Sequence, residues 1–261
     1  MASAPATVGC VLALCVFSAP GVRAQGGPPF FTNDPGTPGN RQWEINVGYI
    51  PLLATDHSTT RTPDLDLNFG LGDRIQLTLE MAWLGDQIPP AATKYGLAQD
   101  ALGVKWRFFG DDPGLAVSIF PQVLINNPSR SVARGIVPPG NSLTLPIEWS
   151  KQIGFIAVNG EAGYTVVQSA AGQWLAGVVA GHEKRIKHRT ASVEFDGEFY
   201  LTGESANHVT QETLEGGCRI ELHPPFVLLA MAGRSVRQTD GSFTAYLGVQ
   251  LLLPRKPFES R

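Results

Sequence analysis

Apolar and polar residues alternate along PDLDLNFGLGDRIQLTLEMAW, residues 63 to 83, on either side of a Gly-Asp turn. Leucines and a phenylalanine fall on one face before the turn, opposite aspartates and an asparagine. The same alternation resumes after it. A repeat of two residues is the period of a β-strand, so the stretch predicts a β-hairpin. Its apolar face could contact either a protein core or lipid, and one hairpin does not decide between them.

The same period recurs along the rest of the chain. We expect further strands over roughly 43–49, 102–108, 115–119, 143–149, 153–165, 173–183, 190–200, 210–222, 225–235 and 242–253, and no helix. Long connections at 53–63, 85–98 and 127–142 alternate with tight ones at 72–74, 110–113 and 150–152. An even strand number with short turns on one side is typical of outer-membrane barrels. The fold class predicted for residues 41–253 is therefore all-β, a transmembrane antiparallel up-and-down β-barrel of about 12 strands.

The five tryptophans support a membrane barrel because all lie near strand ends in the apolar phase. Trp43, Trp106 and Trp149 fall at the short-turn rim, and Trp83 and Trp174 at the long-loop rim. Two aromatic girdles are expected at the interfaces of a bilayer. A soluble barrel of this size would instead need large apolar side chains to fill its interior. The polar face is therefore predicted to line a lumen.

Composition and the N-terminus suggest an exported protein. Only 16% of residues are charged and the net charge is −3, which gives no reason to expect a nucleic-acid partner. The apolar run Val11–Phe17 has the length of a signal-peptide core and is too short for a spanning helix. Small residues at Val22 and Ala24 then fit a cleavage site, which predicts a signal peptide over residues 1–24. Residues 25–40 form an N-terminal segment with Pro-Gly turns, and residues 254–261 a C-terminal tail.

Several short motifs resemble a known family. They are Pro29-Phe30, Thr32-Asn33-Asp34-Pro35, Trp43-Glu44-Ile45-Asn46, Gly70-Leu71-Gly72-Asp73-Arg74 and Leu145-Pro146-Ile147-Glu148. In these the chain resembles the outer-membrane barrels grouped as the "MetA-pathway of phenol degradation" family, often labelled as transporters. The resemblance covers most of the first two-thirds of the chain. It implies an outer-membrane barrel linked to uptake of aromatic or other apolar compounds, with no established catalytic residues.

The N-terminal motif contains two consecutive turn signals, Asn33-Asp34-Pro35-Gly36 and Thr37-Pro38-Gly39-Asn40. Proline presets the first central φ of such a turn, and glycine permits the positive second one. The favoured interpretation is a rigid lead-in to the first strand at the periplasmic rim. The alternative is a small plug or latch that folds into the lumen. The family-like motif itself comprises Thr32, Asn33, Asp34, Pro35 and Gly36.

The histidines and cysteines do not predict an enzyme or a metal site. His57 and His208 fall in loops, His188 and His223 at turns, and His182 at a strand end, with no serine in the apolar phase near it. There is no Gly-x-Ser-x-Gly elbow and no His pair with ligand spacing on one strand face. Cys10 and Cys15 lie in the predicted signal peptide, so Cys218 cannot form an intramolecular disulfide in the mature chain. We expect no catalytic residue, no metal and no cofactor.

Charged residues in the polar phase are the candidates for the lumen wall. They are Glu44, Asp64, Asp66, Glu80, Lys105, Arg107, Glu148, Glu194, Asp196, Glu198 and Arg219. One interpretation is an ion-pair network that braces a narrow, mostly closed lumen. The other is a water-filled path whose acidic excess selects its solute.

The hairpin around Gly72-Asp73-Arg74 also predicts a register. A three-residue turn pairs Leu71 with Ile75 and therefore sets Asp66 opposite Glu80. Because opposed like charges are destabilising, we expect either that one carboxyl group is protonated or that a cation lies between the two. Lys105 or Arg107 on the next strand could supply that cation. If neither reaches, the pair forms a weak cation site on the lumen wall, nearer the long-loop mouth.

These features together predict a monomeric outer-membrane barrel in contact with lipid, after signal-peptide-directed export. The expected function is a passive channel or transporter for small solutes, which the sequence does not identify. The alternatives are a structural barrel with a plugged lumen and, less favoured, a lipid-modifying enzyme.

Overall fold

The structure is a computed structural model that describes residues 27–111, 114–127, 129–168, 170–185, 192–204, 210–222, 225–236 and 241–253. The predicted signal peptide, the C-terminal tail, Cys10, Cys15, His188, His208 and His223 lie outside these residues. Within them, no helix is long and apolar enough to cross a membrane.

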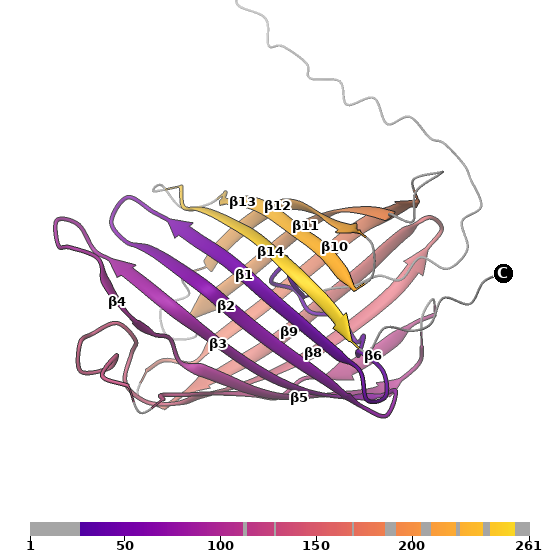
Figure 1. The fold of residues 1–261 in the computed structure, drawn as a ribbon, viewed down its shortest axis with the longest axis horizontal. Helices are drawn as coiled ribbons and strands as arrows, with labels where there is room; N and C mark the ends of the chain where they lie inside the picture. Colours follow the sequence, from indigo (N-terminus) through magenta and orange to yellow (C-terminus); the bar gives the residue numbers. More distant parts are fainter. Residues whose placement is uncertain are drawn as a thin grey trace, which may run out of the picture.

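Fourteen strands follow one another along the described chain (Figure 1). They are β1 (Trp43–Leu53), β2 (Ser58–Leu71), β3 (Ile75–Gln87), β4 (Lys94–Leu97), β5 (Asp100–Phe109), β6 (Ala116–Ile119), β7 (Gln122–Ile125), β8 (Ser142–Ile153), β9 (Ile156–Val167), β10 (Gln173–Arg185), β11 (Ser192–Glu204), β12 (Thr210–Glu221), β13 (Phe226–Ser235) and β14 (Phe243–Leu253).

The fourteen strands form a closed antiparallel barrel with twelve strand positions. β4 and β5 both pair with β3, so together they occupy one strand position of the barrel. β6 and β7 both pair with β5 and with β8, so they also share one position. β1 pairs with β14, from Trp43 opposite Leu253 to Leu53 opposite Phe243, and this pairing closes the sheet. Figure 1 shows the strands running obliquely around the barrel. The predicted fold class and strand number are confirmed.

The two faces of the sheet have opposite chemistry. On β5, Leu102, Val104 and Trp106 point outward and are 47%, 47% and 53% exposed, whereas Ala101 and Lys105 on the other face are buried. β8 repeats the pattern, with Ile147 outward and Glu148 inward. Apolar residues cover the outside of a closed barrel whose inside is polar, which is the arrangement that a lipid bilayer stabilises.

Two predicted connections are wrong. The segment 53–63 is not a long loop, because β1 continues to Leu53 and β2 begins at Ser58. The residues 58–62 are polar on both faces, so their strand carries no alternation to detect. The turn predicted at 150–152 lies later, between β8 and β9, where Gly154 has a φ of 63°. The polar run Ser150-Lys151-Gln152, which suggests a turn, belongs to β8.

The predicted β2–β3 register is confirmed. Leu71 pairs with Ile75 and Asp66 with Glu80. The register shifts between Arg61 and Asp64 in both pairings of β2 with its neighbours, which marks a β-bulge.

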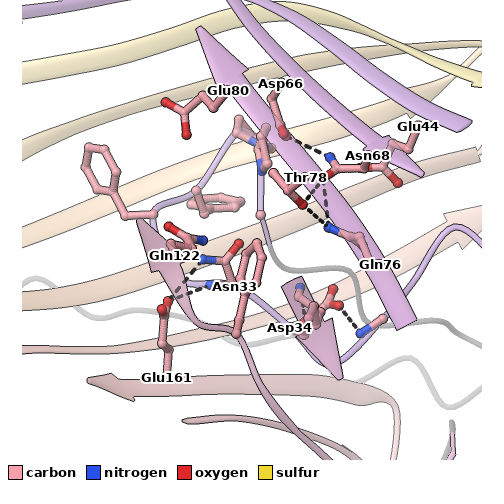
Figure 2. Close-up of a pocket in the computed structure, with 18 of the residues that line it drawn as sticks. Asn33, Asp34, Glu44, Asp66, Asn68, Gln76, Thr78, Glu80, Gln122 and Glu161 are labelled. Atoms are coloured by element: carbon pink, nitrogen blue, oxygen red, sulfur yellow. Dashed lines mark hydrogen bonds between the residues drawn. The ribbon is translucent and has the colours of Figure 1, made fainter. Parts of the chain in front are cut away.

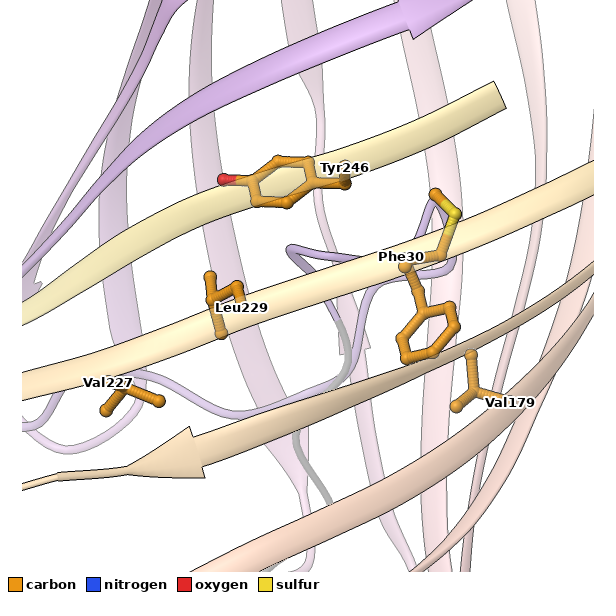
Figure 3. Packing of buried hydrophobic residues seen from close by; sticks show 6 residues of the cluster. Phe30, Val179, Val227, Leu229 and Tyr246 are labelled. Carbon is orange, nitrogen blue, oxygen red and sulfur yellow. The ribbon is translucent and has the colours of Figure 1, made fainter. Parts of the chain in front are cut away.

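An apolar cluster lies inside the barrel (Figure 3). The Phe30 side chain, from the chain before β1, packs with inward-facing residues of β10, β13 and β14. The cluster consists of Phe30, Val179, Val227, Leu229, Met231 and Tyr246. Part of the barrel interior is therefore a packed core, and one of its two aromatic rings, that of Phe30, comes from outside the sheet.

Candidate functional site

Residues 27–40, here called the N-terminal segment, bind to carboxylates of the inner wall. The main-chain N–H groups of Phe31 and Thr32 donate to the two carboxylate oxygens of Glu198, at 3.0 and 2.6 Å. The next N–H, of Asn33, donates to Glu161 at 2.8 Å, and Figure 2 shows these two residues side by side. Thr32 is fully buried. Three successive backbone donors are thus satisfied by side chains of β9 and β11.

Basic side chains of the wall bind the carbonyl groups of the same segment. Lys105 Nζ donates to the Asp34 carbonyl oxygen at 2.5 Å and forms an ion pair with Glu148 at 3.4 Å. Arg219 donates to the Pro28 carbonyl oxygen at 2.6 Å. Lys105 and Arg219 are both buried, and charged groups remain buried when they are paired and hydrogen-bonded. The wall therefore recognises both donors and acceptors of the segment's backbone.

Two glycines of the wall make room for the segment. A Cβ atom at Gly70 would overlap the carbonyl oxygen of Gly39, and one at Gly177 on β10 would overlap the Thr32 hydroxyl. Close approach of two backbones is a common reason for glycine in a strand. Because Gly70 belongs to the Gly-Leu-Gly-Asp-Arg motif and Gly39 to the N-terminal turns, two motifs far apart in sequence contact each other.

The tight turn between β2 and β3 also holds the end of the segment. Gly72 N–H donates to Asn40 Oδ1 at 3.1 Å, and Thr37 donates its hydroxyl to the Asp73 carbonyl at 3.0 Å. Arg107 donates to the same Asp73 carbonyl at 2.7 Å. Residues 37–40 thus lie against the β2–β3 turn, as expected of a lead-in to β1. Residues 28–34 have the contacts with the inner wall that are expected of a plug.

A cavity of about 430 Å³ remains between the segment and the inner wall of the barrel, and β1, β2 and β3 supply much of its lining. Figure 2 shows Glu44, Asp66, Asn68, Gln76 and Thr78 along that wall, with Asn33 and Glu161 across from them. Aromatic rings also line the space, from Phe31, Phe120, Tyr200 and Tyr246. The cavity is acidic along β1, β2 and β3, and the rest of its lining mixes these aromatic rings with charged side chains, among them Lys105, Arg107 and Arg219.

Of the opposed carboxylates Asp66 and Glu80, only Glu80 has a basic partner within the described chain, and that partner is Arg61 rather than Lys105 or Arg107. Asp66 accepts from Asn46 and Asn68 instead. Arg61 forms ion pairs with both Asp64 and Glu80. Strict alternation from Asp64 would point Arg61 outward, and the bulge between Arg61 and Asp64 reverses its face. Lys105 and Arg107 instead bind carbonyls of Asp34 and Asp73.

The candidate lumen residues fall into two groups. Those that line the cavity are Glu44, Asp64, Asp66, Glu80, Lys105, Arg107 and Arg219. Glu148, Glu194 and Glu198 are buried, and Asp196 is half-buried, at other points of the wall. Glu194 lies opposite Arg219 in the β11–β12 ladder, and Glu198 lies opposite Glu215.

Three features of the site are not predicted from the sequence, although two of them have a recognisable pattern in it. Glu161 is in the polar phase of its strand, so alternation alone could have added it. β13 is apolar on both faces, with Val227 and Leu229 inside and Phe226 and Leu228 outside. An apolar inner face needs a cover, and Phe30 provides part of it. The third feature, Arg61, had no signal because its bulge cannot be inferred from alternation.

The two described histidines lie away from this cavity. His57 contacts Asp86 at 2.6 Å near the β1–β2 connection, and His182 contacts the Phe155 carbonyl at 2.8 Å near the β8–β9 turn. Among the residues that the structure describes, no three His, Cys, Asp or Glu side chains come together as a metal site.

Comparison with known proteins defines the class of fold. No protein-family model matches the sequence, and no curated protein matches it. The solved structures similar to it include an outer membrane channel from Pseudomonas putida F1, with a TM-score of 0.60 at 12% identity over 88% of this chain and 100% of that chain. The KdgM porin has a TM-score of 0.55 at 7% identity, and the NanC porin 0.54 at 10%, each over 79% of this chain and 98% of its own. The fold is that of an outer-membrane β-barrel.

Proposed function

We propose that this protein is a monomeric outer-membrane barrel that acts as a passive channel for small solutes, with the N-terminal segment as a displaceable closure. The observation that carries the proposal is the cavity of about 430 Å³ beside a segment that is not a strand of the barrel. The segment is held by hydrogen bonds and by packing of Phe30, so it can leave without opening the sheet. The similarity in fold to a channel and two porins agrees with this function.

The resemblance of the N-terminal and turn motifs supports membership of the phenol-degradation family named above, and with it an apolar or aromatic solute. The aromatic lining of the cavity, which includes Phe120 and Tyr200, suits such a solute. The contact between Gly70 and Gly39 shows that the Gly70–Arg74 motif of this resemblance helps to position the segment. We propose no catalytic function, since the described histidines contact an aspartate and a carbonyl rather than the cavity.

A second candidate is a structural barrel whose lumen stays closed. The burial of Thr32 and Phe30 favours it, because a segment packed this well could be permanent. The two candidates differ in permeability and share the membrane location.

Liposome swelling tests the channel. The full mature chain, reconstituted into vesicles, is expected to admit small uncharged solutes and to exclude solutes too large for the cavity. Vesicles with protein that swell no faster than empty vesicles for any solute would favour the closed structural barrel. Cell fractionation and heat-modifiable gel mobility test the membrane location separately, and a soluble periplasmic protein would contradict it.

A further inference from the structure

The inner wall of the barrel binds the N-terminal segment through its main chain. The N–H groups of Phe31 and Thr32 donate to Glu198, and the N–H of Asn33 donates to Glu161. Every residue except proline offers such a donor, whatever its side chain. What these two carboxylates recognise is therefore present in other peptides as well.

The buried charges that contact the segment are of both signs. Lys105 donates to the carbonyl oxygen of Asp34 at 2.5 Å, and Arg219 to that of Pro28 at 2.6 Å. Glu198, Lys105 and Arg219 are each 5% exposed or less. Buried groups of both signs suit a ligand that offers donors and acceptors together, and a peptide backbone does so.

The side chains of the segment are recognised by their size and apolar character. The Phe30 ring packs between Val179 and Leu229 in the interior cluster (Figure 3). The Thr32 hydroxyl is buried and has no hydrogen-bond partner among the described residues. A Cβ atom at Gly177 would overlap this hydroxyl, so the space at that point fits a small residue. An aromatic residue followed two positions later by a small one thus matches the wall.

Residues 28–34 lie before β1 and belong to none of the described strands. Their contacts with the wall are hydrogen bonds and packing, which a separate peptide can form equally well. The linked segment competes with such a peptide because its effective concentration at the wall is high. A free peptide is therefore expected to bind where the segment has left or holds less tightly.

We propose that the wall around residues 28–34, here called the seat, is a binding site for short peptides, and that the N-terminal segment occupies it as an internal mimic of that ligand. The ligand has an aromatic side chain at the place of Phe30 and a small residue at the place of Thr32. Its N–H groups donate to Glu198, and one of its carbonyl groups accepts from Arg219. The inference rests on the proposed function for its physiological role, because the peptide is then a solute that reaches the seat when the segment leaves.

Fluorescence anisotropy of the full mature chain in detergent tests the seat. The probe is a labelled peptide with the sequence of residues 28–35, blocked at both ends. Phe30→Ala weakens the chain's own segment and leaves the wall unchanged, so this variant should bind the probe at least tenfold more tightly than the unmodified protein. Thr32→Pro removes an N–H that Glu198 accepts and should act in the same direction. Binding of the probe that neither variant increases would overturn the proposal.

Two altered probes test how the peptide is recognised, with the Phe30→Ala protein as receptor. Methylation of the two backbone nitrogens equivalent to those of Phe31 and Thr32 removes both donors to Glu198, and should weaken binding at least tenfold. Alanine in place of the threonine keeps the donors and should change binding less than threefold. A methylated probe that binds as tightly as the original would overturn recognition through the backbone.

A matched pair of wall variants locates the binding site, again in the Phe30→Ala protein. Glu198→Gln should weaken binding of the original probe at least tenfold. Glu44→Gln removes an equal charge from another part of the cavity lining and should change binding less than twofold. An equal loss in both variants would mean general lumen charge rather than the seat, and would overturn the assignment.

Liposome swelling separates this inference from the proposed function. If small uncharged solutes permeate and the probe binds none of these proteins, the channel stands and the peptide site falls. If the Phe30→Ala protein binds the original probe selectively and no solute permeates, the peptide site stands and the channel falls.

Discussion

The main-chain N–H of Thr32 donates a 2.6 Å hydrogen bond to Oε1 of Glu198, a residue 166 positions further along the chain. The second oxygen of the same carboxylate accepts from Phe31 N–H. A single side chain of the barrel wall therefore holds two successive residues of the N-terminal segment. Loss of this one carboxylate charge would therefore weaken two of the hydrogen bonds that hold the segment.

Glu198→Gln should weaken closure without removing the side chain. Hydrogen bonds to a charged group contribute about 1.5–3 kcal/mol, and neutral ones about 0.5–1.5 kcal/mol. Loss of the charge should therefore shift the balance between seated and displaced segment about tenfold, because about 1.4 kcal/mol corresponds to that factor. Open probability in planar bilayers should rise accordingly. Asp196→Asn, on the same face of β11, removes an equal charge and should leave open probability near that of the unmodified protein.

The buried pair of Lys105 and Glu148 gives a prediction about stability. Lys105→Met leaves Glu148, which is fully buried, without its cation, and should lower the free energy of unfolding by about 3–5 kcal/mol. Adding Glu148→Gln should recover part of the loss because the uncompensated charge is gone. Guanidinium unfolding of vesicle-inserted protein, followed by tryptophan fluorescence, measures both. A double variant less stable than Lys105→Met would contradict the role of this pair.

The lipid-facing surface can be tested on β8, where Ile147 points outward and Thr144 lines the cavity. Ile147→Arg should destabilise the folded barrel by about 2–4 kcal/mol if that position lies near the bilayer centre. Thr144→Arg places the same side chain in the lumen and should cost clearly less. The same unfolding measurement compares them, and equal costs would argue against lipid contact on the outer face.

Much of the barrel could be predicted from alternation because each strand must present one face to lipid. The register of β2 and β3 was also predictable, since a tight turn fixes Leu71 opposite Ile75 and hence Asp66 opposite Glu80. Arg61 could not be placed, because a bulge reverses its face and leaves no trace in the apolar pattern. The alternation of apolar and polar residues also did not predict that one strand position is interrupted at Phe120 and Pro121, between β6 and β7.

The position of the N-terminal segment depends on tertiary contacts that its own sequence does not reveal. Its Pro-Gly turns predict local backbone geometry, whether the chain stays at the rim or enters the lumen. The partners that hold it, such as Glu198 and Arg219, lie far away in sequence. The apolar inner face of β13, which contacts Phe30 through the cluster, was the best available indication and became meaningful only beside the folded barrel.

The most direct test of the central claim is a reversible lock on the segment. An ideal Cβ atom at Gly177 lies 3.2 Å from Thr32 Cβ, slightly closer than is usual in a disulfide, so Thr32→Cys with Gly177→Cys should cross-link in a Cys218→Ser background. Planar-bilayer conductance of this variant is measured before and after a reductant, with each single cysteine variant as control. We expect the oxidised double variant to be closed and to show channel openings after reduction. The conductance of each single cysteine variant should not change with the reductant. Conductance that is the same in the oxidised and reduced states would contradict closure by the N-terminal segment.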